Sequence, residues 1–301
     1  MWAGIEAGGT KFVCVLGKGP ENIIAETTIE TRSPKETLSD VIGFFKNQQE
    51  QFGPVKAIGI GTFGPVDLDP DSPTHGYITT TPKQDWTHTN LVGMLKKEFH
   101  VPVGIDTDVN AAALAENLWG AAIGLDTFIY LTIGTGIGGG GMINGKLVHG
   151  LLHPEMGHIL IPHNKVDDPF PGICPFHGDC LEGLACGPAI EKRWGVNPNE
   201  LPPEHRAWEL EARYLAMGLV NYICTLSPQR IIMGGGVMQQ QQLFSLIRKN
   251  VSALLNSYLN LPAILYHIDD YIIPPELSKK AGVLGALALA MEASKDKVIN
   301  P

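Results

Sequence analysis

The chain has 301 residues, of which 44% are hydrophobic and 18% are charged, and its formal net charge at pH 7 is −9. This length is enough for two domains with separate cores or for one large α/β unit. The acidic balance argues against nucleic acid or an anionic membrane surface as the main partner, and no stretch approaches the roughly 20 consecutive apolar residues of a transmembrane helix.

The N-terminus and the cysteines predict a cytoplasmic protein. The first residues, MWAGIEAGGTK, lack the basic segment and the long apolar stretch of a secretory signal peptide. The five cysteines are an odd number, and three of them lie between positions 174 and 186. This pattern indicates a reducing compartment rather than a disulfide-bonded fold.

The first expected element is a β-hairpin with a glycine-rich turn. Residues 2–7 and 12–16 have the composition of short strands, and the turn between them consists of Gly8, Gly9, Thr10 and Lys11. Strands on both sides of the turn exclude a P-loop, which needs a helix after its glycines. Because glycine has no Cβ, the backbone N–H groups and the Thr10 hydroxyl could approach a phosphate. An ordinary structural hairpin is the alternative.

Strands and helices are expected to alternate over the next hundred or so residues. Ser33, Pro34 and Glu36 follow the order of an N-cap, a first-turn proline and an N3 acid, which predicts a helix to about residue 52. Residues 65–90 are rich in Pro, Asp and Thr and are expected to form loops. The other predicted elements are strands at 23–31, 56–61 and 101–105 and helices at 90–99 and 110–119.

Two aspartates follow the strand at 101–105, in the run Asp106-Thr107-Asp108. The carboxyl ends of strands in an open α/β sheet face the ligand crevice, so these carboxylates are candidates for catalysis. The alternative role is to cap the following helix, as aspartate commonly does. Both roles are compatible, one for each aspartate.

A second glycine hairpin is expected later in the chain. The strand at 127–133 leads into Gly134, Thr135 and Gly136, and the segment MINGKLVHG after the glycines has a strand pattern with an Asn-Gly turn. The glycines formally match a dinucleotide-binding fingerprint, but no helix follows them. Beyond this hairpin we expect helices at 207–225, 239–258 and 278–294, strands at 230–233 and 263–268, and a glycine run at Gly234, Gly235 and Gly236.

The segment before residue 187 is rich in cysteine and histidine. Cys174, His177 and Cys180 stand at a Cys-x2-His-x2-Cys spacing, which brings three ligands within reach of one tetrahedral zinc ion. The candidates for the fourth ligand are His153, His158 and His163. His153-Pro154-Glu155 also forms half of a zinc-deaminase signature, but the Pro-Cys-x2-Cys half is absent. A zinc hydrolase is therefore the rival function of a different class.

The repeated hairpin, each time followed by alternating helix and strand, is the pattern of a duplicated actin-like (ribonuclease-H-like) ATPase fold. In this α/β fold two domains hold a nucleotide in the cleft between their hairpins, and closure excludes water. We expect a small N-terminal domain at 1–115 and a larger C-terminal domain at 116–279 that carries the zinc loop 153–182. A C-terminal helix at 280–296 is expected to pack back on the first domain.

Seven short motifs are spread over nearly the whole chain. They are IEAGGTK at 5–11, GIGTFGP at 59–65, DTDVNAA at 106–112, GTGIGG at 134–139, EMGH at 155–158, Cys174 with CLE at 180–182, and GGG at 234–236. With these motifs in this order, the chain resembles the ROK family of sugar kinases. IEAGGTKFVC and HPEMGH with CPFHGDCLEG are most similar to the bacterial fructokinases of that family.

The resemblance implies transfer of phosphate from ATP to a sugar. It makes Asp108 the general base that takes the proton of the sugar hydroxyl as this hydroxyl attacks the γ-phosphate. The implied sugar contacts are Gly64, Glu155, His158 and Glu182. The implied zinc ligands are His158, Cys174, His177 and Cys180. The implied phosphate-binding residues are Gly8, Gly9, Thr10, Gly134, Thr135 and Gly136. The residues implied to contact the adenosine are Pro188, Gly234, Gly235 and Gly236. Lys11 is either a further phosphate contact or a solvated lysine at the strand edge.

Two positions depart from the family pattern. Glu6 stands where the family commonly has Asp, so its contact with Mg²⁺ is expected to be indirect. Thr107 stands where glucose-specific members have Asn, and it lacks the amide donor for one sugar hydroxyl. We therefore expect fructose, phosphorylated at C6, as the substrate, with a mannokinase, a glucokinase or a broad hexokinase as the alternative.

The resemblance also bears on partners. A homodimer is expected, with sugar and ATP as ligands and with no nucleic-acid or membrane partner. The family includes sugar-responsive repressors, which carry an additional helix-turn-helix domain before the sugar-binding fold. The acidic charge and a first strand at residue 2 argue against this role here.

Overall fold

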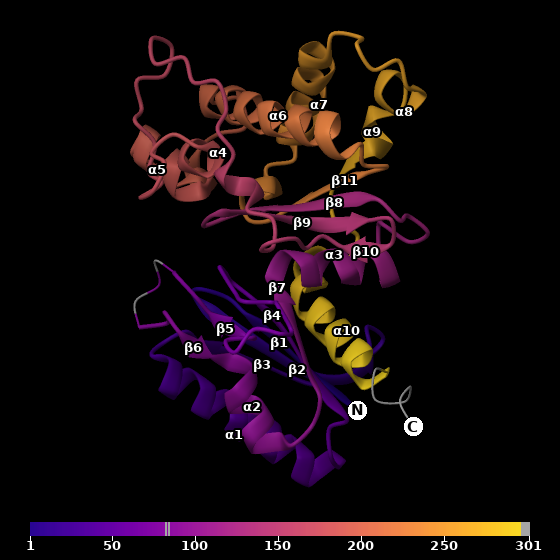
Figure 1. The fold of residues 1–301 in the computed structure, drawn as a ribbon. Helices are drawn as coiled ribbons and strands as arrows, with labels where there is room; N and C mark the ends of the chain where they lie inside the picture. Colours follow the sequence, from indigo (N-terminus) through magenta and orange to yellow (C-terminus); the bar gives the residue numbers. More distant parts are fainter. Residues whose placement is uncertain (82, 84, 296–301) are drawn as a thin grey trace. The chain divides into compact units, whose positions relative to one another are not determined.

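The computed structural model describes residues 1–81, 83 and 85–295 (Figure 1). Contacts divide the chain into two compact units. The first unit comprises Met1–Ile123, Leu147–Pro154 and the described residues from Lys279 to Lys295, and the second comprises Gly124–Lys146 and Glu155–Ser278. This division differs from a single boundary at residue 115, because the chain returns to the first unit at 147–154. Residues 82 and 84 of the expected loop and residue 296 of the expected last helix lie outside the described residues.

The first unit contains a five-stranded sheet in the order β3-β2-β1-β4-β7. Its strands are β1 (Trp2–Ala7), β2 (Lys11–Gly19), β3 (Asn22–Glu30), β4 (Ala57–Thr62) and β7 (Val103–Thr107). β1 to β3 pair antiparallel, whereas β1, β4 and β7 run parallel. The strands expected in this half of the chain are therefore confirmed. The carboxyl ends of β1 and β7 lie two strands apart and carry Glu6 and Asp106.

One face of this sheet is covered by α1 (Pro34–Phe52) and α2 (Leu91–Phe99). Ser33 caps α1 as expected, because its hydroxyl accepts a hydrogen bond from the Glu36 N–H at 3.5 Å. The buried side of α1 carries Leu38, Val41 and Phe45, which pack with the apolar residues of β1, β2 and β4. The loop expected at 65–90 contains only two short paired strands among its described residues, β5 (Tyr77–Ile78) and β6 (Thr89–Asn90).

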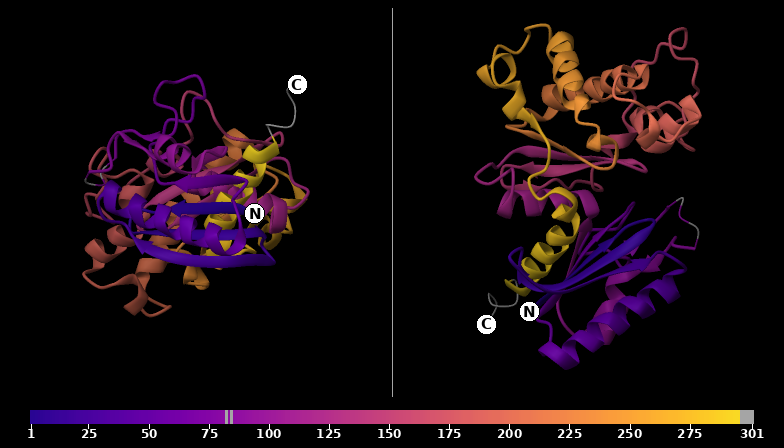
Figure 2. Two further views of the ribbon diagram at one scale, coloured as in Figure 1. Left: turned by 90° about the horizontal axis from the view of Figure 1, so that it is seen from below. Right: turned by 180° about the vertical axis from the view of Figure 1, so that it is seen from behind.

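The other face of the same sheet is covered by α3 (Asp108–Trp119) and α10 (Ala281–Lys295) (Figure 2). Gly4, Gly59 and Gly104 stand side by side on β1, β4 and β7. A Cβ on Gly59 would lie 1.9 Å from the carbonyl oxygen of Ala286 in α10. This row of glycines lets the helix backbone lie directly on the sheet, at a distance that a side chain would not allow.

The second unit repeats the strand order of the first. Its sheet runs β10-β9-β8-β11-β12, with β8 antiparallel to β9 and parallel to β11. The strands are β8 (Phe128–Ile133), β9 (Ile137–Ile143), β10 (Lys146–Leu147), β11 (Ile231–Gly234) and β12 (Ile272–Ile273). In each unit the first strand pairs antiparallel with the next strand of its hairpin on one side and with a parallel strand on the other. This repeat confirms the predicted duplication.

Two long helices, α6 (Arg206–Leu226) and α7 (Gln242–Leu255), form the main core of the second unit. Its shorter helices are η1 (Met156–His158), α4 (Leu181–Ala185), α5 (Gly187–Trp194), η2 (Pro198–Glu200), η3 (Val237–Gln239), α8 (Pro262–Leu265) and α9 (Ile268–Tyr271). The strand predicted at 263–268 is wrong, because α8 and the start of α9 occupy it. Pro262 stands in the first turn of α8, where its fixed φ favours a helix, and the edge strand comes later, at Ile272–Ile273. Among the described residues, no helix is both long and apolar enough to cross a membrane.

Candidate active site

The turn from β7 into α3 positions the central carboxylate. The N-cap of α3 is Thr107, whose hydroxyl accepts a hydrogen bond from the Asn110 N–H at 3.2 Å. The expectation that one of the aspartates caps the helix is therefore wrong. Asp108 is the first helical residue, and its Oδ1 accepts a bond from the Val109 N–H at 2.9 Å. The backbone thus holds one carboxylate oxygen and leaves the other available for chemistry.

Two carboxyl groups in the first unit have raised pKa values. Burial raises the pKa of Asp108 to about 6. Burial, and then the charge of Asp108, raises the pKa of Glu6 to about 7. Glu6 lies at the carboxyl end of β1, against Gly282 at the start of α10, where a Cβ would lie 2.4 Å from its Oε1. Two carboxyl groups that titrate near neutral pH suit proton transfer or the binding of a hard cation.

The first glycine turn joins β1 to β2 as predicted. The Gly8 N–H donates to the Lys11 carbonyl at 3.0 Å, and the Thr31 hydroxyl donates to the Gly8 carbonyl at 2.8 Å. Gly9, Thr10 and Lys11 are exposed. The turn is thus held by its own backbone and by the Thr31 hydroxyl, and its tip is exposed.

A second turn in the first unit, at Gly64, contacts a histidine that lies far away in the sequence. The Val66 N–H donates to Nε2 of His153 at 3.2 Å. A Cβ on Gly64 would lie 3.0 Å from Cε1 of the same ring. His153 is 6% exposed, and burial lowers its pKa. It therefore packs on the Gly64 turn and takes no part in the metal cluster, which removes one candidate for the fourth ligand and the first residue of the deaminase signature.

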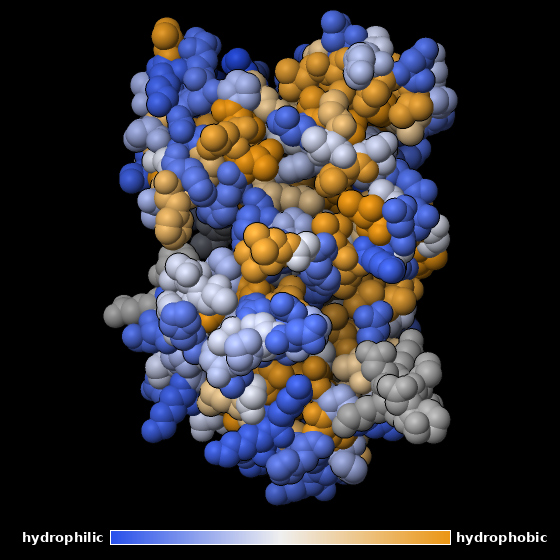
Figure 3. Space-filling model, in the orientation of Figure 1, coloured by the Kyte–Doolittle hydropathy of each residue, from blue (hydrophilic) through white to orange (hydrophobic). Residues whose placement is uncertain are grey.

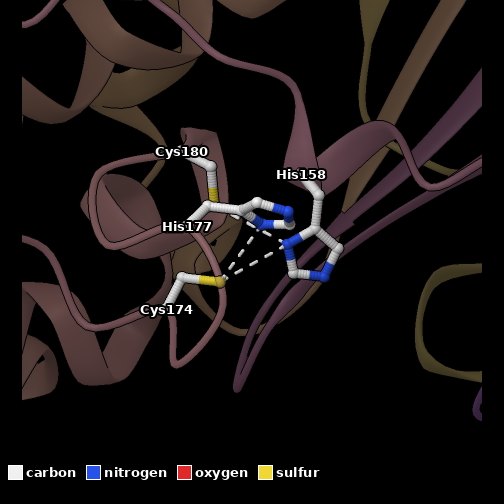
Figure 4. A group of neighbouring side chains, drawn as sticks. All are labelled: His158, Cys174, His177 and Cys180. Atoms are coloured by element: carbon white, nitrogen blue, oxygen red, sulfur yellow. Dashed lines mark hydrogen bonds between the residues drawn. The ribbon is translucent and has the colours of Figure 1, made fainter. Parts of the chain in front are cut away.

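The second unit brings His158, Cys174, His177 and Cys180 together (Figure 4). Nδ1 of His158 lies 3.7 Å from Sγ of Cys174 and 3.6 Å from Sγ of Cys180. Nδ1 of His177 lies 3.6 Å from Sγ of Cys174. With zinc–sulfur bonds near 2.3 Å and zinc–nitrogen bonds near 2.0 Å, tetrahedral geometry places sulfur and nitrogen roughly 3.6 Å apart. The four side chains therefore fit a zinc ion.

His163, the remaining candidate for the fourth ligand, belongs to a different network. Its Nδ1 lies 3.0 Å from Oδ2 of Asp179, and its Nε2 lies 2.9 Å from the Asp168 carbonyl. Asp168 is also bound by Arg193 Nε at 3.2 Å and by the Tyr214 hydroxyl at 2.6 Å. No local motif indicates this buried network, because two of its members, Arg193 and Tyr214, come from α5 and α6. It anchors the loop before Cys174 without using any metal ligand.

Glu182 connects the cluster to the second glycine hairpin. Its Oε1 lies 3.8 Å from Nε2 of His158, and its Oε2 accepts a bond from the Ile137 N–H at 2.9 Å. A Cβ on Gly136 would lie 2.6 Å from Oε2, so a larger residue here would displace the Glu182 carboxylate. The free ring nitrogen of His158, the Glu182 carboxylate and the hairpin turn therefore lie together. Glu155 precedes His158 as the N-cap residue of η1 and is exposed.

Three backbone segments of the second unit converge at the same hairpin. The Gly134 N–H donates to the Gly136 carbonyl at 2.8 Å, and the Gly187 N–H donates to the Gly134 carbonyl at 2.7 Å. Gly235, with φ +97°, lies against Ile133, and Gly236 N is 3.9 Å from where a Cβ of Gly134 would stand. Pro188 follows Gly187 in the first turn of α5. The expected nucleotide-binding residues of this unit are therefore close together, and Gly187 joins them.

Residues 2–293 match the ROK family. Over 293 residues, which cover 97% of this chain and 96% of the relative, the chain is 52% identical to a putative fructokinase of Bacillus subtilis (strain 168). It is 45% identical to a fructokinase of Zymomonas mobilis, with 96% of each chain covered. The solved structure of a ROK family glucokinase from Streptomyces griseus, in complex with glucose and AMPPNP, aligns with a TM-score of 0.75 and 25% identity over 96% of this chain and 99% of that one. The fold is therefore the actin-like fold that the sequence predicts.

Proposed function

This chain belongs to the ROK family, and we propose that it is a fructokinase that transfers the γ-phosphate of ATP to the C6 hydroxyl of D-fructose. The observation that carries the proposal is the position of Asp108, at the first turn of α3 with a pKa raised to about 6 by burial. The names of the two relatives above favour fructose among the hexoses. A hexokinase of broad specificity is the alternative.

Asp108 is the general base in this proposal. Its carboxylate takes the proton of the C6 hydroxyl as the hydroxyl oxygen attacks the γ-phosphorus, and the bond from this phosphorus to the bridging oxygen of ADP breaks. The products are ADP and fructose 6-phosphate, with the proton left on Asp108. A group with a pKa near 6 is mostly ionised at neutral pH and still basic enough to accept this proton.

The sugar contacts in this proposal come from five positions besides Asp108. They are Gly64, Thr107, Glu155, His158 and Glu182. The pairing of His158 Nε2 with Glu182 Oε1 at 3.8 Å supports their acting as one polar wall. The Thr107 hydroxyl accepts the helix-capping bond from Asn110, and it offers a sugar one proton where an asparagine amide would offer two. This limited capacity favours a sugar other than glucose.

The nucleotide would bind at the two glycine turns. We assign its phosphates to Gly8, Gly9, Thr10, Lys11, Gly134, Thr135 and Gly136, and its adenosine to Pro188, Gly234, Gly235 and Gly236. The hydrogen bonds that fix Gly134 to Gly136 and to Gly187 support a turn that is ordered before a ligand arrives. Glu6, beside Asp108, would contact the Mg²⁺ of MgATP indirectly, through water.

Zinc would be held by His158, Cys174, His177 and Cys180. With four protein ligands the ion is structural, and its chemistry is to fix side chains rather than to activate water. A His158 ring held through Nδ1 presents Nε2 in one orientation toward Glu182 and the sugar. Structural zinc in this position would therefore be needed for sugar binding.

Initial rates with ATP and four sugars test the function. We expect kcat/KM to be highest for fructose, lower for mannose and glucose, and lowest for N-acetylmannosamine. NMR of the product should place the phosphate on C6. A tenfold preference for glucose would contradict the assignment to fructose, and an absence of phosphorylation with all four sugars would contradict the kinase.

We also propose that the protein is a cytoplasmic homodimer. Figure 3 shows apolar side chains gathered over α7 to α9, and the exposed residues there include Leu254, Tyr258, Leu261, Leu265 and Tyr266. A patch of this kind is typical of a surface that another protein covers. None of the five cysteines, all of which the structure describes, forms a disulfide, which supports a reducing compartment. Light scattering during size-exclusion chromatography should give twice the 32.5 kDa chain mass, and a single-chain mass would contradict the dimer.

A further inference from the structure

Eight residues, Leu147–Pro154, form a strap that belongs to the first unit, although the chain before and after them belongs to the second. Two histidines of the strap, His149 and His153, bind the first unit through their rings. Their partners lie in the two turns that carry Asp108 and Gly64. These partners are 43 and 87 residues away in the sequence, so no local motif indicates the contacts.

His149 binds the carboxylate that organises the start of α3. Its Nε2 lies 2.8 Å from Oδ2 of Asp106, whose side chain is 3% exposed. Oδ1 of Asp106 accepts bonds from the Thr107 N–H at 2.7 Å and from Asn110 Nδ2 at 2.9 Å. The hydrogen bond to Asp106 raises the pKa of His149, which favours the charged ring. Without this partner, Oδ2 of the buried Asp106 carboxylate would lose its hydrogen bond to His149.

Asn110 also contacts the strap, through the backbone. Its Nδ2 also lies 3.4 Å from the Val148 carbonyl. Asp106 and Asn110 therefore hold both the strap and the turn that begins with Asp108. A shift of the strap would alter the direction of the Asp108 side chain, and rates of phosphoryl transfer depend steeply on such positioning.

His153 fixes the other turn. Its Nε2 accepts the Val66 N–H at 3.2 Å and its Nδ1 lies 3.4 Å from the Pro154 carbonyl, so the proton belongs on Nδ1 and the ring is neutral. Its Cε1 and Nε2 occupy the space beside Gly64. The ring thus sets the path of the backbone at Gly64.

We propose that His149 and His153 are positioning residues for phosphoryl transfer, His149 for the catalytic Asp108 and His153 for the sugar-contacting turn at Gly64. The inference rests on the proposed roles of Asp108 and Gly64. It assigns different kinetic effects to the two rings. Loss of the His149 contact lowers kcat, whereas loss of the His153 contact raises the KM for the sugar. Neither changes the KM for ATP, because the glycine turns are untouched.

Matched substitutions test this. Glutamine can place a polar atom where Nε2 of histidine stands, whereas asparagine is one methylene too short. We expect His149→Asn to lower kcat for fructose at least tenfold and His153→Asn to raise the fructose KM at least tenfold, with the ATP KM within twofold of wild type. His149→Gln and His153→Gln should recover most of each loss. His267→Gln, at an exposed position in the second unit, controls for the substitution itself.

Several results would overturn the proposal. Asn variants with kcat and both KM values within twofold of wild type would do so, as would Gln variants no better than Asn. Equal increases of both KM values would indicate general structural damage. If His149→Asn does not fold, Asp106→Asn removes the same ion pair from the other side and should lower kcat alone. A wild-type protein that phosphorylates no sugar would instead refute the proposed function.

Discussion

The carboxylate region of the first unit and the cysteine-histidine cluster of the second are held in different ways. The cluster draws its four side chains from one segment, residues 158–180, and brings their ligand atoms within 4.8 Å of one another, close enough to hold one ion. In the carboxylate region the protein supplies the partners itself, through Thr107, Asn110 and His149 around Asp106. If the proposed zinc ion binds, one region depends on metal and the other on buried hydrogen bonds. A substitution in one region should therefore disrupt that region and leave the other unchanged.

The largest expected effect is a loss of activity on a substitution that changes only the carboxylate region. Asp108→Asn keeps the shape of the side chain but removes the base, so kcat for fructose should fall at least about a hundredfold. The fructose KM and the zinc content should stay near wild type. Asp71→Asn, at an exposed aspartate of the same unit, is the control. A loss of less than tenfold would mean that another group accepts the proton.

The next substitution changes only the cysteine-histidine cluster. Cys180→Ala removes a buried ligand, so elemental analysis should find less zinc, and the melting temperature should fall by at least about 5 °C. Cys224→Ala changes an exposed thiol outside the cluster and should leave both values unchanged. Unaltered zinc in Cys180→Ala would show that the ligand set is wrong.

A third substitution tests whether the first unit depends on close packing rather than on metal. Gly59→Ala would place a methyl group 1.9 Å from the Ala286 carbonyl oxygen, so α10 must move and the free energy of unfolding should fall by about 3 kcal/mol. Gly43→Ala lies in α1 with no atom within 4 Å of its Cβ, and it should be neutral or stabilise by up to about 1 kcal/mol. Equal stabilities of the two variants would contradict the packing described for α10.

The smallest expected effect is the dependence of kcat/KM and of stability on pH, which reports the ionisation of Asp108. The carboxylate must be ionised to act as a base, so kcat/KM should be constant above its pKa of about 6 and fall about tenfold per pH unit below it. Burial raises this pKa, so the folded state binds the proton more tightly than the unfolded state, and stability falls as the pH rises from about 4 to about 6. The melting temperature of Asp108→Asn should therefore exceed that of wild type at pH 8 and match it near pH 4. A pH-independent rate between pH 5 and 8 would exclude Asp108 as the base.

Sequence reasoning found most of the fold because the informative patterns are local. Ser33, Pro34 and Glu36 mark the start of α1 within one turn, and the two glycine hairpins reveal the duplication. The Cys-x2-His-x2-Cys spacing likewise places three side chains of the cluster within seven residues. Local signals compete after Pro262. The apolar run there predicts a strand, but the proline begins a helix.

The contacts that sequence reasoning missed join residues far apart in the chain. His153 was a candidate zinc ligand because of its neighbours in the sequence, but its ring binds the backbone of Val66. The carboxylate of Glu182 lies against Gly136, and Arg193 and Tyr214 reach Asp168 from α5 and α6. Spacing carries no information on such pairs, because each depends on how whole elements pack.

A competition assay measures the preference for fructose and the need for Asp108 in one experiment. Equal concentrations of fructose and glucose are incubated with the protein and limiting MgATP, and the two sugar phosphates are separated and counted. Their ratio equals the ratio of the two kcat/KM values. We expect fructose 6-phosphate to be the main product with the wild-type protein, and neither product to form at a comparable rate with Asp108→Asn. A tenfold excess of glucose 6-phosphate, or undiminished phosphorylation by the variant, would contradict this expectation.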